Sequence, residues 1–343
     1  MPPLIRHTRP VDVLVTGAGG FIGGHLVGAL LRKGLSVRAV DIKPLDQWFQ
    51  HHQGAEPVVA DLQRWESAQA VMRGVGAVYQ LASDMGGMGF IEQHKARCML
   101  SVLINTHLLM AARDAGVQRF FYASSACVYN AERQASPGVM PLREEDAYPA
   151  LPEDGYGWEK LFSERMCRHF TEDFGLATRV ARYHNVYGPH GTWDGGREKA
   201  PAAICRKVIA AKQQGFRDIE IWGDGEQTRS FMYIDDCIHG TLGLCASDHA
   251  EPINIGSSEL VSINQLVDLV EEIAGIRLVR RYRLNAPKGV AGRNSDNTRL
   301  RTLLGWEPSV TLREGLEQTY RWIHDEYMAR QAGRSPLRAI AAS

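Results

Sequence analysis

Two kinds of hydrophobic pattern alternate along the first half of the chain. Short runs rich in β-branched residues, such as Val11 to Thr16, predict buried strands. Longer stretches with apolar residues three or four positions apart, such as Phe21 to Lys33, predict helices between them. Strand–helix alternation of this kind predicts an α/β fold with a doubly wound parallel sheet. The strands are expected at 11–16, 36–40, 57–60, 77–81, 119–123 and 177–182, and the helices at 21–33, 64–73, 91–115 and 156–174.

The pattern changes after about residue 186, where Gly and Pro become more frequent and the elements shorter. Helices are expected there at 262–274 and 311–328. This change predicts a doubly wound domain over residues 10–185, followed by a smaller mixed α/β lobe over residues 186–330. A later segment near 230–256 is expected to return to the doubly wound domain. Residues 331–343, rich in Ala, Arg and Ser, are expected to form a mobile tail.

Charge and composition exclude several classes of protein. The 343 residues include 39 Lys and Arg against 39 Asp and Glu, and a balanced charge argues against a nucleic-acid or membrane-surface partner. No apolar run reaches the roughly 18 residues that span a bilayer, and residues 1–10 lack the apolar core of a signal peptide. The six Cys show no metal-ligand spacing, which predicts reduced thiols and no metal site. We therefore expect a cytoplasmic protein.

A glycine-rich turn lies between the first expected strand and helix. The spacing of Gly17, Gly20 and Gly23 lets the backbone turn tightly and brings its amides and the helix N-terminus to a pyrophosphate. Asp41 ends the second strand, where a carboxylate accepts hydrogen bonds from adenosine ribose hydroxyls and repels a 2′-phosphate. These residues predict a Rossmann-type domain that binds NAD, while Lys43 keeps NADP open as an alternative.

A tyrosine and a lysine four residues apart open the helix expected at 156–174. Positions i and i+4 share one helical face, so the ammonium of Lys160 is expected beside the hydroxyl of Tyr156. A free tyrosine has a pKa near ~10, and a base working near neutral pH needs a lower one. Lys160 and a positively charged nicotinamide would both lower it. Ser124 and Ser125 end an upstream strand, where a hydroxyl can bind a sugar oxygen.

Together these motifs resemble the extended short-chain dehydrogenase/reductase family, which acts on nucleotide sugars. The resemblance covers roughly residues 11–327 and includes Arg229, whose counterpart in the family contacts the substrate diphosphate. It implies a nucleotide-sugar substrate, an NAD cofactor and a homodimer formed through the helices at 91–115 and 156–174. It also implies that the cofactor contacts Gly17, Gly20, Phe21, Ile22, Gly23, Asp41, Asp61, Leu62, Leu81, Tyr156 and Lys160.

Narrower segments resemble members of the family that are isomerases of GDP-mannose and invert C3 and C5. These segments are 84–90, 124–129, 183–189, 195–203 and 292–296. The resemblance implies catalytic roles for Tyr156, Lys160 and Ser125, and an acid/base pair of Cys127 and Lys199. It implies substrate contacts from Gly86, Gly87, Ser125, Cys127, Asn185, Glu198, Lys199, Lys207, Gln227, Arg229 and Arg293, and GDP-L-galactose or GDP-L-gulose as products.

The residue types suit that chemistry. If Tyr156 takes the proton of a sugar C4 hydroxyl while NAD takes the hydride, the new ketone acidifies the hydrogens on C3 and C5. Inverting either carbon then needs a base on one face and an acid on the other. Cys127 is a thiol with an ordinary pKa near ~8.5, and a buried Lys199 would have a pKa closer to neutrality.

Three other functions remain open on the sequence. A nucleotide-sugar 4-epimerase needs Tyr156 and Lys160 but no second acid/base pair. A 4,6-dehydratase commonly carries a carboxylate pair after the Ser/Thr position, where this chain has Ala126-Cys127-Val128. A non-catalytic NAD sensor predicts a broken Tyr-xxx-Lys motif, whereas both residues are present.

Overall fold

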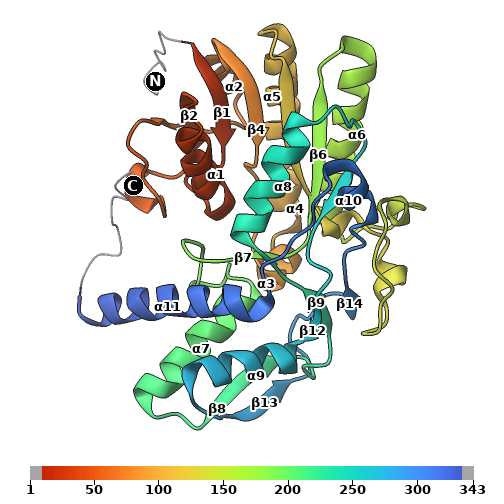
Figure 1. Cartoon of the computed structure of the whole chain (residues 1–343). Helices are drawn as coiled ribbons and strands as arrows, with labels where there is room; N and C mark the ends of the chain where they lie inside the picture. Colours follow the sequence, from red (N-terminus) through yellow and green to blue (C-terminus); the bar gives the residue numbers. More distant parts are fainter. Residues whose placement is uncertain (1–9, 334–343) are drawn as a thin grey trace.

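The computed structural model describes residues 10–333, so the segment tested for a signal peptide (1–9) and most of the expected tail (334–343) lie outside the described residues. Residues 11–183, together with a later strand at 253–255, contribute a seven-stranded sheet in which every neighbouring pair is parallel (Figure 1). The predicted doubly wound α/β fold is confirmed. In spatial order the strands are β3 (Glu56–Val59), β2 (Val37–Asp41), β1 (Val11–Thr16), β4 (Val75–Gln80), β5 (Arg119–Ser125), β6 (Thr178–Tyr183) and β11 (Ile253–Ile255).

Helices cover both faces of this sheet because successive side chains of each strand point to opposite faces. Val13 and Val15 of β1 pack in one apolar cluster with α1 and α8, whereas Leu14 packs in the other cluster with α2, α5 and α6. A central strand that is apolar at nearly every position is therefore buried on both sides. These helices are α1 (Phe21–Arg32), α2 (Trp65–Met72), α5 (Ser101–Asp114), α6 (Tyr156–Phe174) and α8 (Ile234–Ala246).

The prediction of a single helix over residues 91–115 is wrong. The chain instead forms α3 (Met88–Gln93) and α4 (Lys95–Met99) before α5 begins at Ser101. His94 interrupts the run with a ψ of 42°, and its ring Nδ1 lies 3.0 Å from the carbonyl oxygen of Phe90. Helical spacing of apolar residues continues through the break, so the pattern alone does not reveal the change of direction.

Most of the chain after β6 forms a smaller lobe below the sheet in the view of Figure 1, whereas α8 and β11 return to the main sheet. Capping boxes at Ser262 and Thr311 fix the starts of two of its helices, close to where the sequence predicts them. The helices α7 and α8 were not predicted. The lobe contains α7 (Ala200–Gln214), α9 (Ile263–Ala274), α11 (Leu312–Gln331), the parallel pair β8 (Asp218–Trp222) and β13 (Val279–Arg283), and a sheet of β12 (Leu260–Ser262), β9 (Thr228–Ser230) and β14 (Gly292–Arg293).

The remaining elements are short. They are β7 (Val186–Tyr187), β10 (Met232–Tyr233), α10 (Thr298–Leu304) and the 3-10 turns η1 (Leu45–Gln47), η2 (Ala126–Val128), η3 (Ala131–Gln134) and η4 (Glu144–Ala147). All six cysteines are free and buried. Within residues 10–333, no helix is both long and apolar enough to cross a bilayer. The boundary between two domains at 185/186 stays a prediction.

Candidate active site

The glycine turn after β1 is shaped for close approach to a phosphate group. Gly17 has a φ of +70°, a conformation that glycine adopts without strain. A Cβ at Gly23 would lie 2.1 Å from the carbonyl oxygen of Gly17, so only glycine fits there. Gly20 precedes α1 and no side chain caps that helix, which leaves its N-terminus open to an anion. The turn therefore fits the pyrophosphate of a dinucleotide.

Asp41 at the end of β2 holds this turn in place. Its carboxylate accepts hydrogen bonds from the backbone amides of Gly19 and Lys43, both at 3.0 Å. The indole of Trp48 covers the turn, since a Cβ at Gly19 would lie 2.5 Å from Trp48 Cδ1. Sequence reasoning missed Trp48, because the glycine spacing says nothing about a side chain that arrives from a later loop.

The other predicted cofactor contacts surround the same end of the sheet. Asp61 follows β3, and its Oδ1 accepts a hydrogen bond of 3.0 Å from the amide of Gln63. The amide of Leu81, just after β4, lies 3.2 Å from Thr16 Oγ1. Leu62 is buried, and the side chains of Phe21 and Ile22 are partly buried against the core. Parallel strands end at one edge, which is why these distant segments meet.

Tyr156 and Lys160 lie on the first turns of α6, as their spacing predicts. Both are buried, and the Lys160 ammonium lies 5.5 Å from the centre of the Tyr156 ring. Lys160 Nζ also donates to the carbonyl oxygen of Ala123 at 3.2 Å. Burial, and then the Cys127 thiol, raise the pKa of Tyr156 well above its ordinary value. Lys160 alone therefore does not produce the lowered pKa expected from the sequence, because desolvation of the phenolate outweighs it.

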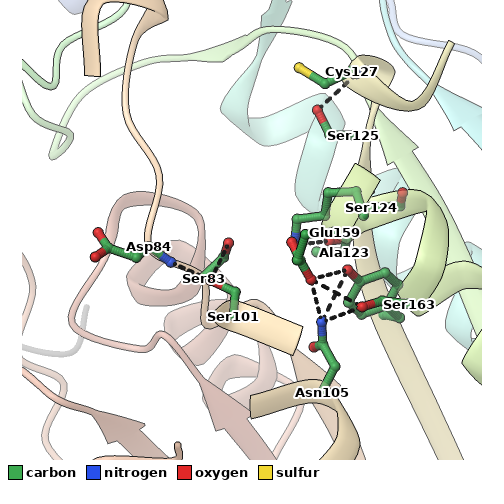
Figure 2. Close-up of polar contacts among 12 residues, drawn as sticks. Ser83, Asp84, Ser101, Asn105, Ala123, Ser124, Ser125, Cys127, Glu159 and Ser163 are labelled. Atoms are coloured by element: carbon green, nitrogen blue, oxygen red, sulfur yellow. Dashed lines mark hydrogen bonds and ion pairs between the residues drawn. The ribbon is translucent and has the colours of Figure 1, made fainter. Parts of the chain in front are cut away.

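Asn105, Glu159 and Ser163 form a buried hydrogen-bond network (Figure 2), and Glu159 connects it to Lys160. Asn105 Nδ2 of α5 donates to Glu159 Oε1 and to Ser163 Oγ, both at 2.7 Å. Glu159 Oε2 lies 3.7 Å from Lys160 Nζ, and both side chains are almost fully buried. Sequence reasoning missed Asn105 and Glu159. Glu159 is next to Lys160 in the chain, but its role depends on α5, which no local pattern connects to α6.

Cys127 lies directly beside this pair. Ser125 Oγ accepts a hydrogen bond of 3.2 Å from the Cys127 amide, which starts the turn η2 (Figure 2). Gly157 of α6 packs against η2 so tightly that a Cβ would lie 2.3 Å from the Cys127 carbonyl oxygen. The thiol shares a small apolar cluster with Phe90 and Tyr156. Burial, and then the carboxylate of Glu153, raise the pKa of Cys127 to about 11.

Lys199 reaches the same region from the second lobe. It occupies the N-cap position of α7, at the end of the loop that follows Gly195 and Gly196. Burial lowers the pKa of its ammonium, and the Cys127 thiol opposes that effect. The preceding segment is fastened to the glycine loop after β4: the Gly87 amide donates to the Arg197 carbonyl at 3.0 Å, and Arg197 Nη1 lies 2.8 Å from Asp84 Oδ1.

Several predicted substrate contacts bring positive charge to this site. Arg229 and Arg293 are paired opposite each other on β9 and β14. Arg229 donates to the backbone carbonyls of Thr228, Lys288 and Val290, and burial, reinforced by Arg293, lowers its pKa to about 10. The two guanidinium groups are close enough for Arg293 to lower the pKa of Arg229, so an anion that contacts both would be stabilised.

The remaining predicted contacts are held mainly by backbone groups. Asn185 has a φ of +24° and its Nδ2 donates to the Ser230 carbonyl at 3.1 Å. Lys207 Nζ donates to the Glu220 carbonyl at 2.8 Å, and Gln227 Nε2 to that of Trp222 at 2.8 Å. Glu198 Oε2 accepts from the Gly196 amide at 2.7 Å. A Cβ on Gly86 or Gly87 would collide with Phe90 or with the Glu198 carbonyl.

Fold and site together define a class of protein. The sequence model of the NAD dependent epimerase/dehydratase family matches residues 13–256, and the chain belongs to this family. Among solved structures, UDP-glucose 4-epimerase of Thermotoga maritima with UDP-glucose superposes with a TM-score of 0.81 at 27% identity, covering 92% of this chain and 99% of that one. UDP-glucuronic acid 4-epimerase of Bacillus cereus, in complex with UDP-glucuronic acid and NAD, gives 0.78 at 27% identity, covering 92% and 99%.

Curated relatives of higher identity narrow the comparison. GDP-mannose 3,5-epimerase 1 of Oryza sativa subsp. japonica is 46% identical over 320 residues, which cover 93% of this chain and 83% of the relative. GDP-mannose 3,5-epimerase of Arabidopsis thaliana is 43% identical over 334 residues, covering 97% and 87%. UDP-glucuronic acid decarboxylase 1 of Xenopus tropicalis is 28% identical.

Proposed function

We propose that this protein is an NAD-dependent epimerase of GDP-mannose that inverts C3, C5 or both through a 4-keto sugar. The observation that carries the proposal is the buried Cys127 thiol, which packs beside Tyr156 and lies close enough to Lys199 to act on the pKa of its ammonium. A reaction confined to C4 has no use for this second pair of proton-exchanging groups. The identity of 43–46% to curated GDP-mannose 3,5-epimerases supports the substrate.

The glycine turn, Asp41 and the Lys160 side chain are the groups proposed to hold NAD. When bound, NAD supplies a hydride acceptor that makes C4 a ketone and later returns the hydride. Tyr156 removes and returns the C4 hydroxyl proton. Its pKa is raised by burial, so it depends on nearby positive charge, including that of Lys160, to act as a base. Ser125 positions the sugar oxygen.

Cys127 and Lys199 are proposed to exchange protons with C3 and C5. Inversion requires removal of the proton on one face of the ring and return on the other. The two groups come from different parts of the molecule, Cys127 from η2 after β5 and Lys199 from the start of α7. A sugar bound between them would meet one proton-exchanging group on each face. The products would be GDP-L-galactose, GDP-L-gulose or both.

The guanidinium groups of Arg229 and Arg293 are the proposed contacts for the diphosphate. They lie on adjacent strands, and the Cys127 thiol is within 3.5 Å of Arg293 Nη1. An anion bound there would place the attached sugar close to the thiol. Lys207 and Gln227 are proposed to extend this contact toward the nucleotide, and Asn185, Glu198 and the Gly86–Gly87 loop toward the sugar.

The 4-epimerase and 4,6-dehydratase alternatives use the same Tyr156 and Lys160. A dehydratase with a carboxylate pair after Ser125 is disfavoured, because that position carries the apolar turn Ala126–Val128. A non-catalytic NAD sensor is disfavoured because Tyr156 and Lys160 are brought together inside the site. The 4-epimerase differs in its labelling pattern, which the experiment below uses.

We also propose a homodimer and a cytoplasmic location. Neighbouring helices α4, α5 and α6 expose large apolar side chains that a second copy of the chain would cover. The exposed side chains are Met99, Leu100, Leu103, Trp158 and Phe162. The balanced charge and the lack of a membrane-spanning helix within residues 10–333 support the location.

The decisive experiment is incubation of the holoenzyme with GDP-mannose in D₂O, followed by NMR of the sugar. We expect deuterium at C3 and C5 and new signals of L-configured sugar. Deuterium at neither carbon, with NAD bound and a C4-inverted product, would replace the proposal with a 4-epimerase. UDP-glucose serves as the matched control substrate and is expected to take up no label.

A further inference from the structure

A buried carboxylate that the proposed reaction leaves unused lies next to the thiol. Glu153 lies three residues before the start of α6, and its side chain is only 10% exposed. Its Oε2 is buried and has no hydrogen-bond partner among the described residues. Its backbone amide donates to the Cys127 carbonyl at 3.0 Å, so the chain segments of the two residues are directly connected. Burying a carboxylate with one oxygen lacking a hydrogen bond costs folding free energy, so its presence calls for an explanation.

Arg293 connects the carboxylate to the sulfur. Its Nη2 lies 2.5 Å from Glu153 Oε1, and its Nη1 lies 3.5 Å from Cys127 Sγ. Its Nε donates to Gln134 Oε1 at 2.7 Å. The planar guanidinium is therefore fixed by three side chains, and the ion pair with Glu153 determines which edge it turns toward the thiol.

We propose that Glu153 is a positioning residue of the Cys127 acid/base centre: it orients Arg293 against the sulfur and keeps the resting thiol protonated. The proposal rests on the function proposed above only for the use of Cys127. Other charged or titratable groups also act on this thiol. They are Tyr156 on α6, Arg229 on β9 and Lys199 at the start of α7.

The charges favour this role over that of a proton relay. Although burial opposes it, Arg293 lowers the pKa of Glu153 below its ordinary value of 4.5, while the pKa of Cys127 is about 11. Moving the thiol proton to Glu153 is therefore unfavourable, because the pKa of the carboxyl is lowered while that of the thiol is raised. The carboxylate stays charged and acts through its field and through Arg293.

Removing the carboxylate charge makes a specific prediction about the thiol. In Glu153→Gln the shape is kept, and Arg229 and Arg293 face Cys127 without their buried counter-charge. We expect the midpoint of thiolate formation to fall by at least about one pH unit. Glu153→Asp keeps the charge and should stay near the wild type. Arg293→Gln removes the positive charge and should move the midpoint upward.

Thiolate formation is measured by ultraviolet absorbance of the holoenzyme across pH, with the corresponding Cys127→Ser variant as the blank for each protein. The measurement needs no sugar, so it remains informative if GDP-mannose proves not to be the substrate. Equal midpoints for wild type and Glu153→Gln, or a fall in Arg293→Gln, would overturn the proposal. If Glu153→Gln does not fold, the directions in Glu153→Asp and Arg293→Gln decide.

Discussion

Tyr156 shows how far a buried environment can work against the chemistry proposed for a side chain. The Tyr156 hydroxyl must lose its proton to act as a base, yet burial raises its pKa. The ammonium of Lys160 is held near it by the Ala123 carbonyl and by the Glu159 carboxylate. The tyrosine therefore depends on the positive charge of neighbouring groups to lose its proton. If the Tyr156 hydroxyl is removed, no other hydroxyl on α6 takes its position.

We expect Tyr156→Phe to lose all turnover, because no group remains to take the C4 hydroxyl proton. Transient reduction of bound NAD should disappear as well, which the near-ultraviolet absorbance of reduced NAD measures. NAD binding to the variant is the control. Retained turnover would remove Tyr156 from the mechanism.

Cys127→Ala tests a different step. The thiol is proposed to act on C3 and C5 and not on C4. The rate at which solvent deuterium enters C3 and C5 should therefore fall by roughly 10²–10⁴-fold. Reduction of NAD by the sugar should remain. NMR in D₂O measures the first effect and absorbance the second. Normal deuterium uptake would show that Cys127 is a structural residue.

At the scale of helices and strands, the contact between α6 and the turn η2 brings the proposed C4 base, Tyr156, next to the proposed acid/base group Cys127. Gly157 allows the first turn of α6 to approach the Cys127 backbone, and Gly87 does the same for the segment before α7. Arg197 then fastens that segment to Asp84 and lies over the Phe90 ring, with 3.9 Å between its guanidinium carbon and the ring centre. The spacing of Tyr156, Cys127 and Lys199 is thus set by two close backbone contacts and by the side chain of Arg197.

Gly157→Ala should therefore reduce activity although alanine favours helices. The added methyl would lie 2.3 Å from the Cys127 carbonyl, so α6 and η2 must separate. We expect a loss of about a hundredfold in kcat and of about 1–3 kcal/mol in the free energy of unfolding. Gly243→Ala in α8 is the control, because its methyl would meet only the movable end of Leu304. Wild-type activity in Gly157→Ala would contradict this account.

Local spacing predicted the elements and residues whose geometry is local. The glycine turn, Asp41 at the end of β2 and the Tyr156/Lys160 pair needed only the periods of strands and helices. Glu153, Asn105 and Trp48 were missed, because they reach the site through tertiary packing that no spacing encodes. The helix expected at 91–115 was wrong for a related reason: the pattern continues through His94, where the backbone leaves the helix.

At the scale of the whole molecule, the neighbouring helices α5 and α6 together present exposed apolar side chains. Leu103 is 38% and Phe162 52% exposed, on the neighbouring helices α5 and α6. In the double variant Leu103→Glu, Phe162→Glu we expect a dimer to become a monomer, because two charges per chain would be buried. Sedimentation equilibrium gives the mass. Val279→Glu, also on an exposed apolar position, should stay dimeric.

Acid should weaken the whole fold through His184. This fully buried imidazole follows β6 with its Nε2 3.0 Å from Asn254 Oδ1, and burial lowers its pKa to about 3. Between pH 6.5 and 3 the unfolded chain binds this proton and the folded one does not, so stability falls as pH falls. His184 alone should cost about 2 kcal/mol at pH 5 relative to pH 7. Urea unfolding at both pH values checks this, and His184→Asn should show a smaller difference.

The last strand of the main sheet has a consequence for how the protein is made. β11 pairs with β6 through Ile253 and Ala181, so the sheet is completed only after some seventy further residues have been synthesised. Until then β6, a fully buried strand in the finished protein, presents an unpaired edge. Such an edge is prone to pair with other chains. A nascent chain that pauses near residue 185, just after β6, would thus need a chaperone to shield this edge. A fragment that ends near residue 185 would be expected to aggregate.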